Sequence, residues 1–271
     1  MQRILLIGKT GQLGWELQRT LATLGEMFVF DFPEIDLAKP ESLREVIRNV
    51  SPQIIINAAA YTNVDKAESE PELVQKVNAE APQVMAEEAK RLNAAFIHLN
   101  VYGRTKLAGE QAVQEVGGSY LILRTSWVYS LRQGGFVTKV LQWARSQTTL
   151  HIVDDQIGSP TSARMLAEAT SQVIAQGRGN PFDYIYGNHG LYHLAGLGCV
   201  NRYDWTKEIL ELNPNRAEQT IKELIPAKTA EFPLPAKRPL YSGLDCIKFA
   251  NASTINFPDW WHALKLTIVN N

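Results

Sequence analysis

The chain has 271 residues, of which 45% are hydrophobic and 20% charged, and its formal net charge is −1. This composition predicts a globular protein with a sizeable core, and it gives no electrostatic case for binding nucleic acid or an anionic membrane. No apolar run is long enough to span a bilayer, and we expect no signal peptide, so we predict a cytoplasmic protein. Cys199 and Cys246 lack metal-ligand spacing and are expected to be reduced, partly buried thiols.

The N-terminal segment predicts a dinucleotide site. Residues 3–7 (RILLI) are typical of a buried parallel strand, and residues 15–21 have helical periodicity. The glycine-rich turn between them would let backbone approach a pyrophosphate at the N-terminus of the helix. The spacing is Gly-x-x-Gly-x-x-Gly rather than Gly-x-Gly-x-x-Gly, and an ordinary strand-to-helix turn is the alternative. The cofactor-binding candidates in this turn are Gly8, Lys9, Thr10, Gly11, Gln12, Leu13 and Gly14.

The predicted second strand, residues 28–30, ends at Asp31. An acidic residue about 20 positions after the turn can accept a hydrogen bond from the ribose 2′-OH, which favours NADH. Lys9 could instead neutralise a 2′-phosphate, which favours NADPH, so both cofactors remain open. A polar residue that closes a strand is the alternative for Asp31. Asp36 and Leu37, which follow this strand, are further candidate cofactor contacts.

Strands and helices alternate through the first half of the chain. Strands are expected at 53–57, 94–98 and 120–124, and helices at 42–47, 71–91 and 101–116. This alternation predicts an α/β fold with a doubly wound, Rossmann-like parallel sheet. Beyond residue 152 we expect helices at 161–176 and 203–212 and a proline-rich connector at 226–239. We therefore assign 1–150 to a dinucleotide-binding domain and 151–271 mainly to a smaller substrate-binding lobe, with some return to the first domain.

Two further features point to the carboxyl ends of the strands. Ala58, Ala59 and Ala60 leave space after the strand at 53–57, where ligands of such sheets bind, and Tyr61 follows them. A tightly packed junction is the alternative.

The second feature is a tyrosine and a lysine four residues apart. Tyr102 and Lys106 would share one face of the predicted helix. The ammonium group would lower the tyrosine pKa, so that the phenol could protonate a developing alkoxide. A solvated Tyr–Lys pair is the alternative.

Several motifs resemble those of the dTDP-4-dehydrorhamnose reductase family, which belongs to the extended short-chain dehydrogenases. The main ones are residues 8–17 (GKTGQLGWEL), 57–68 (NAAAYTNVDKAE), 100–110 (NVYGRTKLAGE) and 124–129 (RTSWVY). Residues 155–161, 192–196 and 238–242 add further similarity, so the resemblance covers nearly the whole chain.

The resemblance implies reduction of the C4 ketone of dTDP-4-dehydro-L-rhamnose to dTDP-L-rhamnose by NADPH or NADH. In the family pattern Tyr102 protonates the C4 alkoxide, and Lys106 holds the nicotinamide ribose and lowers the tyrosine pKa. Trp127 would pack against the sugar nucleotide, with core packing as the alternative. Arg238 is a candidate for the phosphates, because a guanidinium suits bidentate contacts, and a surface residue is its alternative. The candidates for the space between cofactor and substrate are Tyr61, Thr62, Asn63 and Val64.

The chain departs from the family pattern after His98, where a segment with a catalytic Ser or Thr is expected. The sequence passes directly from His98 to Leu99, and hardly any residues remain for a strand-to-helix loop. Either the chain lacks this loop, which would remove a hydroxyl donor from the alkoxide site, or residues between His98 and Leu99 are missing from the sequence. We favour the second interpretation.

Other interpretations remain open. A non-catalytic, NADP-binding protein that resembles the regulatory subunit of methionine adenosyltransferase would suit the absence of the Ser/Thr segment. Another nucleotide-sugar short-chain dehydrogenase, such as an epimerase or dehydratase, is a further alternative. We expect a small-molecule partner, the nucleotide sugar, and a possible homodimer. Some family members dimerise around magnesium held by glutamates, but we interpret Glu16 as a favourable charge in the first helical turn and predict no required metal.

Overall fold

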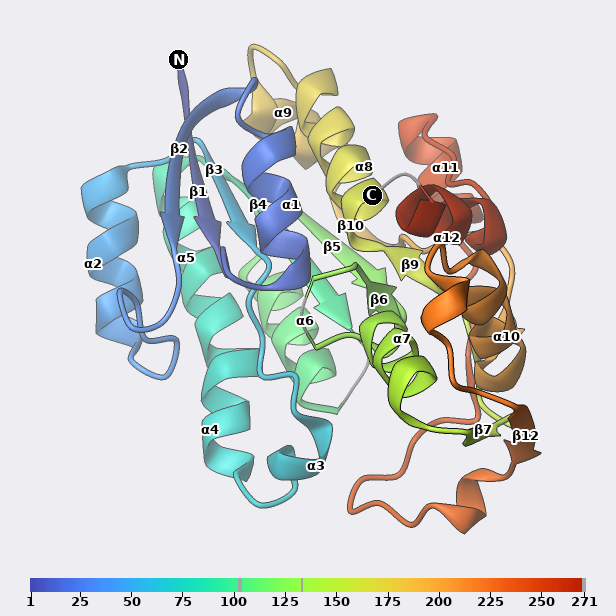
Figure 1. Ribbon diagram of the computed structural model, residues 1–271. Coiled ribbons are helices and arrows are strands. Elements are labelled where there is room, and N and C mark those ends of the chain that lie inside the picture. The colour runs from blue at the N-terminus through green and yellow to red at the C-terminus, as the bar shows by residue number, and fades with distance from the viewer. Residues whose placement is uncertain (102–103, 133, 270–271) are drawn as a thin grey trace.

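The structure is a computed structural model that describes residues 1–101, 104–132 and 134–269. A six-stranded sheet with the order β10-β5-β4-β3-β1-β2 lies at its centre (Figure 1). All of its neighbouring strands pair in parallel. The predicted doubly wound α/β fold is thereby confirmed. The strands are β1 (Gln2–Ile7), β2 (Gly25–Phe30), β3 (Ile54–Asn57), β4 (Ala95–Val101), β5 (Tyr120–Thr125) and β10 (Gly190–His193).

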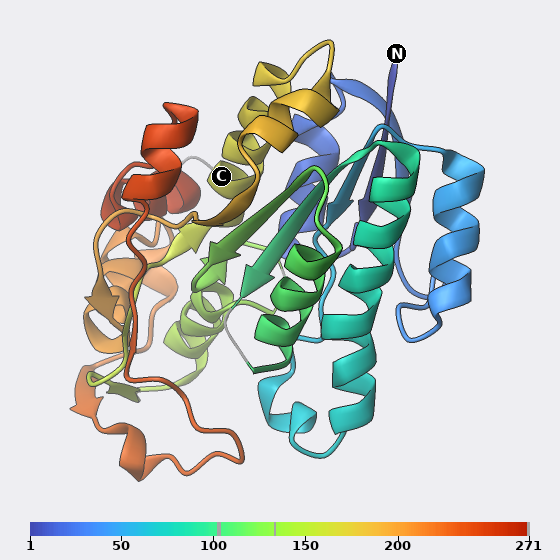
Figure 2. The ribbon, with the colours of Figure 1, turned by 180° about the vertical axis from the view of Figure 1, so that it is seen from behind.

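Helices cover both faces of the sheet because successive strand side chains alternate between them. Ile4 and Leu6 pack in a core with α1 (Gln12–Thr20) and α8 (Ala163–Gln176), which are in front in Figure 1. Leu5 and Ile7 pack in the opposite core, against α2 and α5, and α6 also contributes to this core (Figure 2). These three helices are α2 (Pro40–Val50), α5 (Ala81–Leu92) and α6 (Arg104–Val116).

A third core lies in the second half of the chain. It joins α7 (Phe136–Ser146), α10 (Arg202–Leu212) and α12 (Trp260–Val269) around the fully buried Trp205. Beside it is a small sheet with the order β11-β8-β13. Helix α7 belongs to the third core but precedes residue 150, and β10 belongs to the main sheet but follows it. The third core and the main sheet therefore alternate along the chain, and the domain division at residue 150 stays a prediction.

The remaining elements are short. The strands are β6 (Val128–Tyr129), β7 (Thr149–Val153), β8 (Ile157–Gly158), β9 (Thr161–Ser162), β11 (Val200–Asn201), β12 (Glu223–Ala227) and β13 (Tyr241–Ser242). The helices are α3 (Val64–Ala67), α4 (Pro71–Gln75), the π-helical η1 (Lys76–Glu80), α9 (Pro181–Gly187), the 3-10 segments η2 (Arg216–Glu218) and η3 (Thr229–Glu231), and α11 (Ile247–Ser253).

The structure corrects several expectations. Strand β4 does not end at His98: Leu99 and Asn100 continue it by pairing with Leu123 and Arg124, because the buried Leu99 extends the apolar face of the sheet. His98 and Leu99 are therefore consecutive strand residues, and α6 begins at Arg104 rather than at residue 101. The helix predicted over 71–91 is divided into α4, η1 and α5.

Two smaller expectations also need correction. Cys199 is exposed rather than partly buried, whereas Cys246 is buried, and both thiols are free. Glu16 lies beyond the first turn of α1, because that helix begins at Gln12, so the carboxylate does not occupy the position nearest the positive helix end.

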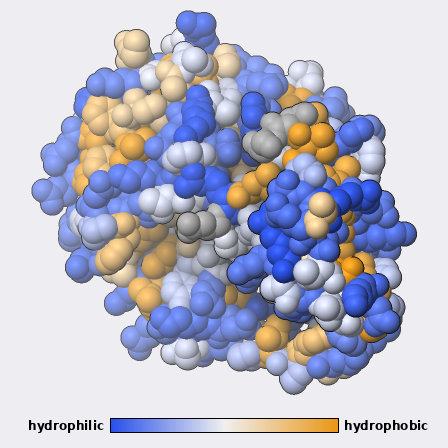
Figure 3. Space-filling view, viewed as in Figure 1, coloured by the Kyte–Doolittle hydropathy of each residue, from blue (hydrophilic) through white to orange (hydrophobic). Residues whose placement is uncertain are grey.

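None of the helices in the described ranges is long and apolar enough to cross a membrane. On the face shown in Figure 3, hydrophilic residues predominate and apolar residues form separate groups.

A buried carboxylate ties α2 to α5. Glu88 is 2% exposed and accepts hydrogen bonds from Arg48 Nη2 at 2.6 Å and Arg91 Nε at 2.7 Å. Burial alone would raise the pKa of Glu88, but the bonds from Arg48 and Arg91 outweigh it and lower the pKa to about 2. The ion pairs therefore stabilise the fold above the unfolded-state pKa of about 4.5, and this contribution is lost as the pH falls toward 2.

Glu88→Gln should lower the free energy of unfolding by about 3 kcal/mol at pH 7, and by about half as much at pH 3. Urea unfolding at the two pH values measures this difference. An equal loss at both values would contradict the assignment of the stabilisation to the ionised carboxylate.

Gly14→Ala should destabilise the protein by about 1–3 kcal/mol, because its Cβ would lie 1.8 Å from the Gly8 carbonyl oxygen. Gly187→Ala is the matched control, since nothing lies within 4 Å of its added Cβ. The thermal unfolding midpoint should fall for Gly14→Ala and hardly change for Gly187→Ala. Equal shifts would show that the close contact between Gly14 and Gly8 does not contribute to stability.

Candidate functional site

The glycine turn brings two strand ends into backbone contact. Gly8 has φ +97°, a conformation that favours glycine, and a Cβ on it would lie 2.7 Å from the Ala59 nitrogen. Gly14 meets the Gly8 carbonyl from the first turn of α1, as described above. The turn therefore lies against the end of β3 without side chains between them, which leaves room for a ligand over the backbone.

The N-terminus of α1 is open to such a ligand. Its N-cap is Gly11, and no side chain caps it. Backbone N–H groups at an uncapped helix start bind phosphate oxygens well. The side chains around the turn are held elsewhere: Gln12 Oε1 accepts a hydrogen bond from Ser130 Oγ at 2.9 Å, and Leu13 packs on the core.

Asp31 is bonded to the turn itself. Its Oδ2 accepts from the Thr10 nitrogen at 2.9 Å and from Thr10 Oγ1 at 2.6 Å, and its Oδ1 accepts from the Phe32 nitrogen at 2.9 Å. A carboxylate has about four acceptor positions, so one remains for a ribose hydroxyl. Lys9 Nζ lies 2.5 Å from Glu34 Oε2, so part of the charge that a 2′-phosphate would meet is already neutralised.

Asp36 and Leu37 both make contacts within the protein. Asp36 Oδ1 accepts from the Ala38 nitrogen at 3.0 Å, and Leu37 packs against the core between the sheet and α2. A cofactor role for both stays a prediction.

The segment after β3 is fastened to η1. Asn78 Oδ1 accepts from the Tyr61 nitrogen at 2.9 Å, and Asn78 Nδ2 donates to Thr105 Oγ1 at 3.3 Å, so one amide links this segment to α6. Tyr61 also donates its hydroxyl proton to Glu70 Oε2 at 2.6 Å. Ala58, Ala59 and Ala60 are half-buried beside the glycine turn. The structure thus brings the two predicted cofactor segments together.

Lys106 lies at the carboxyl edge of the sheet and is 8% exposed. Within the described residues, no carboxylate forms an ion pair with its ammonium group. Burial lowers the pKa of Lys106 to about 8, although the negative charge of Glu110 opposes the shift. A buried ammonium with a lowered pKa at a strand end is characteristic of a functional site.

His98 lies close to this ammonium group and is neutral. Burial, and then the charge of Lys106, lowers the pKa of His98 to about 3. Asn57 Oδ1 accepts from the Ala59 nitrogen, so Asn57 Nδ2 donates to His98 Nδ1 at 3.2 Å and the imidazole proton resides on Nε2. Nε2 has no partner among the described residues.

A buried ion pair supports the start of α6, and the sequence analysis missed it. Arg124 Nη2 lies 2.5 Å from Glu110 Oε2. Asn100 Nδ2 donates both to Glu110 Oε1 at 2.9 Å and to the Lys106 carbonyl at 3.3 Å. Glu110 and Arg124 both lie in the motifs at 100–110 and 124–129, but nothing in the sequence pairs them, because they belong to α6 and β5 and meet only in the fold. Tyr102 itself lies outside the described residues, so its relation to Lys106 stays a prediction.

Trp127 lies in an aromatic cluster. Its ring stacks near Trp205 at a centroid distance of 5.5 Å, and the Arg202 guanidinium carbon lies 3.6 Å from its ring centroid. A Cβ on Gly158 would lie 2.4 Å from the ring, and Trp127 has a left-handed backbone with φ +43°. The ring is therefore partly covered by the protein. Core packing and contact with a sugar nucleotide both stay predictions.

Arg238 is held across the molecule by α3. Arg238 Nη2 lies 2.7 Å from Asp65 Oδ2, and the Ala236 nitrogen donates to Asp65 Oδ1 at 3.3 Å. Asn63 caps α3 by accepting from the Lys66 nitrogen, while Thr62 and Val64 are exposed beside it. The structure thus places Arg238 beside the predicted substrate segment at residues 62–64.

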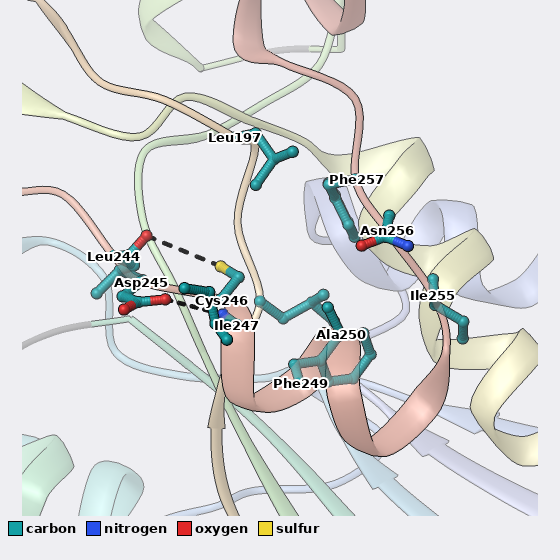
Figure 4. Close-up of a pocket in the computed structure, with 11 residues that line it drawn as sticks. Leu197, Leu244, Asp245, Cys246, Ile247, Phe249, Ala250, Ile255, Asn256 and Phe257 are labelled. Atoms are coloured by element: carbon teal, nitrogen blue, oxygen red, sulfur yellow. Dashed lines mark hydrogen bonds between the residues drawn. The ribbon is translucent and has the colours of Figure 1, made fainter.

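The cavity drawn in Figure 4 lies elsewhere. Its volume is about 300 Å³, and it is lined mainly by apolar side chains of α11 and of residues 255–257, with Leu194 and Leu197. It contains none of the predicted site residues. Within the described parts of the chain, no three His, Cys, Asp or Glu side chains converge as metal ligands.

Comparisons with known proteins agree with the motifs. The sequence model of the family described as the RmlD substrate binding domain matches residues 1–100 and 99–271. A curated relative from Escherichia coli (strain K12), named dTDP-4-dehydrorhamnose reductase, is 39% identical over 290 residues, covering 97% of this chain and 95% of the relative.

Solved structures with the same family name have a similar fold. A dTDP-4-dehydrorhamnose reductase from Bacillus anthracis in complex with NADP has a TM-score of 0.89 at 27% identity, and covers 100% of this chain and 99% of its own. An orthologue from Clostridium acetobutylicum has a TM-score of 0.88 at 30% identity, with 98% of each chain covered.

The family match is divided where the chain departs from the family pattern. Its two segments meet at residues 99–100, directly after His98. The alignment with the Escherichia coli relative extends over 290 positions, more than the 271 residues of this chain, so some positions of the relative have no counterpart here. On these full-length matches, the chain belongs to the RmlD substrate binding domain family.

Proposed function

We propose that this protein is an NADPH- or NADH-dependent reductase that converts dTDP-4-dehydro-L-rhamnose to dTDP-L-rhamnose. The buried Lys106, in the first turn of the helix that follows β4, carries the proposal, together with the uncapped start of α1 at the glycine turn. The names of the relatives, which match nearly the whole chain, supply the substrate.

The turn and the strand ends fit a nicotinamide dinucleotide. The backbone of Gly8, Gly11 and Gly14 would hold the diphosphate at the start of α1, and the remaining acceptor position of Asp31 would take a ribose hydroxyl. When bound, the cofactor supplies the hydride for the C4 carbon. The ion pair between Lys9 and Glu34 favours a cofactor without a 2′-phosphate, which is NADH, but NADPH also remains compatible with the site.

The proton comes from Tyr102 in this proposal. Hydride addition to the ketone leaves an alkoxide on C4, and the phenol donates its proton to that oxygen. The protonated Lys106 stabilises the resulting phenolate and donates to the nicotinamide ribose. Its burial strengthens both interactions, because the local dielectric is low. Asn100 and Glu110 hold the first turns of α6 in place through the bonds described above.

A second candidate function has a specific observation in its favour. The chain joins His98 directly to Leu99 within β4, so the Ser/Thr segment of the family pattern is not present between these two residues. A non-catalytic protein that binds NADP would have this site without turnover. Peptide mapping across residues 95–110 of the natural protein shows whether additional residues lie there, and NADPH binding without oxidation in the presence of the 4-keto sugar nucleotide would favour this candidate.

Tyr102→Phe and Lys106→Met should each reduce kcat by at least about 100-fold, because each removes part of the proton donor. In the wild type kcat/KM should fall as the pH rises past about 8, since Lys106 then loses the positive charge that would stabilise the phenolate. Oxidation of NADPH at 340 nm measures turnover. Full turnover by Tyr102→Phe would refute the proton-donor role.

Arg238→Met should raise KM for the nucleotide sugar at least about tenfold and leave the Kd for NADPH unchanged, because the guanidinium would contact the substrate phosphates. Lys237→Met is the matched control: it removes the same charge from an exposed neighbouring position. A parallel rise in the two variants would indicate a general electrostatic effect instead of a direct contact.

A further inference from the structure

Arg202 is a guanidinium enclosed by aromatic rings. Its central carbon lies 3.6 Å from the Trp127 ring centroid, 4.4 Å from that of Phe136 and 5.4 Å from that of Trp205. Among the described residues, no carboxylate forms an ion pair with it and no acceptor takes a hydrogen bond from its side chain. Arg202 is half-buried, and ring faces compensate the lost hydration of a cation only in part, so an anion placed beside this guanidinium would be favourable.

The small sheet places Arg202 and Arg238 at the same end of β8. Asn201 and Tyr241 both pair with Ile157, one on each side of β8. One residue further, the Arg202 nitrogen donates to the Gln156 carbonyl, and the Ile157 nitrogen donates to the Leu240 carbonyl. Arg238, two residues before Leu240, therefore approaches from the strand opposite Arg202.

The two arginines repel each other. Burial, and then the charge of Arg238, lowers the pKa of Arg202 to about 9, so the group stays protonated at neutral pH. Asp65, which lies in α3, neutralises Arg238 in the connector. One carboxylate thus faces two guanidinium groups. An added anion with two negative phosphate groups would relieve this imbalance.

We infer that Arg202 and Arg238 together form a diphosphate-binding site, in which Arg202 contacts one phosphate of the nucleotide sugar from the aromatic cluster. The inference rests on the proposed nucleotide-sugar substrate. It assigns to Arg202 a binding role, and it gives the cluster of Trp127, Phe136 and Trp205 the task of holding the guanidinium in place. Planar guanidinium groups suit this task because they stack on rings and still present N–H donors to phosphate.

The test compares dTDP with thymidine, which has the same base and sugar but no phosphate. Isothermal titration calorimetry measures both affinities on the wild type and on Arg202→Met, with Lys237→Met as the charge-matched control. Arg202→Met should weaken dTDP binding at least about 30-fold and thymidine binding less than about 3-fold, whereas Lys237→Met should change neither by more than about 3-fold. NADPH binding should stay unchanged in both variants.

The ratio of the two affinities on one variant is insensitive to partial unfolding, and Arg202→Lys provides a second variant that keeps the charge. Arg202→Lys should retain most of the wild-type preference for dTDP over thymidine. Equal weakening of dTDP and thymidine in Arg202→Met would show a structural role and overturn the inference, as would unchanged dTDP affinity or a wild type that does not bind dTDP. Loss of the dTDP preference in a protein without reductase turnover would support the inference and refute the proposed function.

Discussion

The burial of one ammonium group sets the chemistry of this protein. Lys106 lies at the carboxyl edge of a parallel sheet, and within the described residues its charge is balanced only at a distance, by Glu110. An isolated buried cation is costly, so the surrounding elements must be held firmly for it to persist. The ion pair of Glu110 with Arg124 and the amide of Asn100 provide this support from the sheet itself. At the glycine turn, Gly8 and Gly14 allow close backbone approaches that a Cβ would block.

Local chemistry made part of this arrangement predictable. The strand at residues 3–7 and the glycine turn follow from an apolar run and from spaced glycines, and both are present. The parallel sheet followed from the alternation of elements. The expected end of β4 at His98 was wrong because pairing with β5, a long-range interaction, extends the strand through Val101. Sequence periodicity does not contain that information.

The surroundings of Arg202 and Trp127 were less predictable, because they too depend on contacts between residues far apart in the sequence. The role of Arg202 depends on three rings from separate elements and on an arginine 36 positions later in the chain. No motif signals such a cluster. The covering of Trp127 by Arg202 and Gly158 likewise arises only when β8 and α10 pack together. The left-handed backbone of Trp127 is costly for a non-glycine residue. Such a conformation persists only where the surrounding structure holds it in place.

Polar contacts join segments that are far apart in the chain. Asp65 in α3 holds Arg238 in the connector, and Gln12 at the start of α1 accepts a hydrogen bond from Ser130. These contacts fix the positions of α1 and α3 relative to later segments of the chain.

Isotope transfer tests the central claim most directly. The protein is incubated with dTDP-4-dehydro-L-rhamnose and each of the two C4-deuterated stereoisomers of NADPH, and the product is analysed by NMR and mass spectrometry. The account predicts that one of the two isomers delivers a single deuterium to C4 of the sugar. A product without deuterium from either isomer, or with the label at another carbon, would contradict direct hydride transfer at this site.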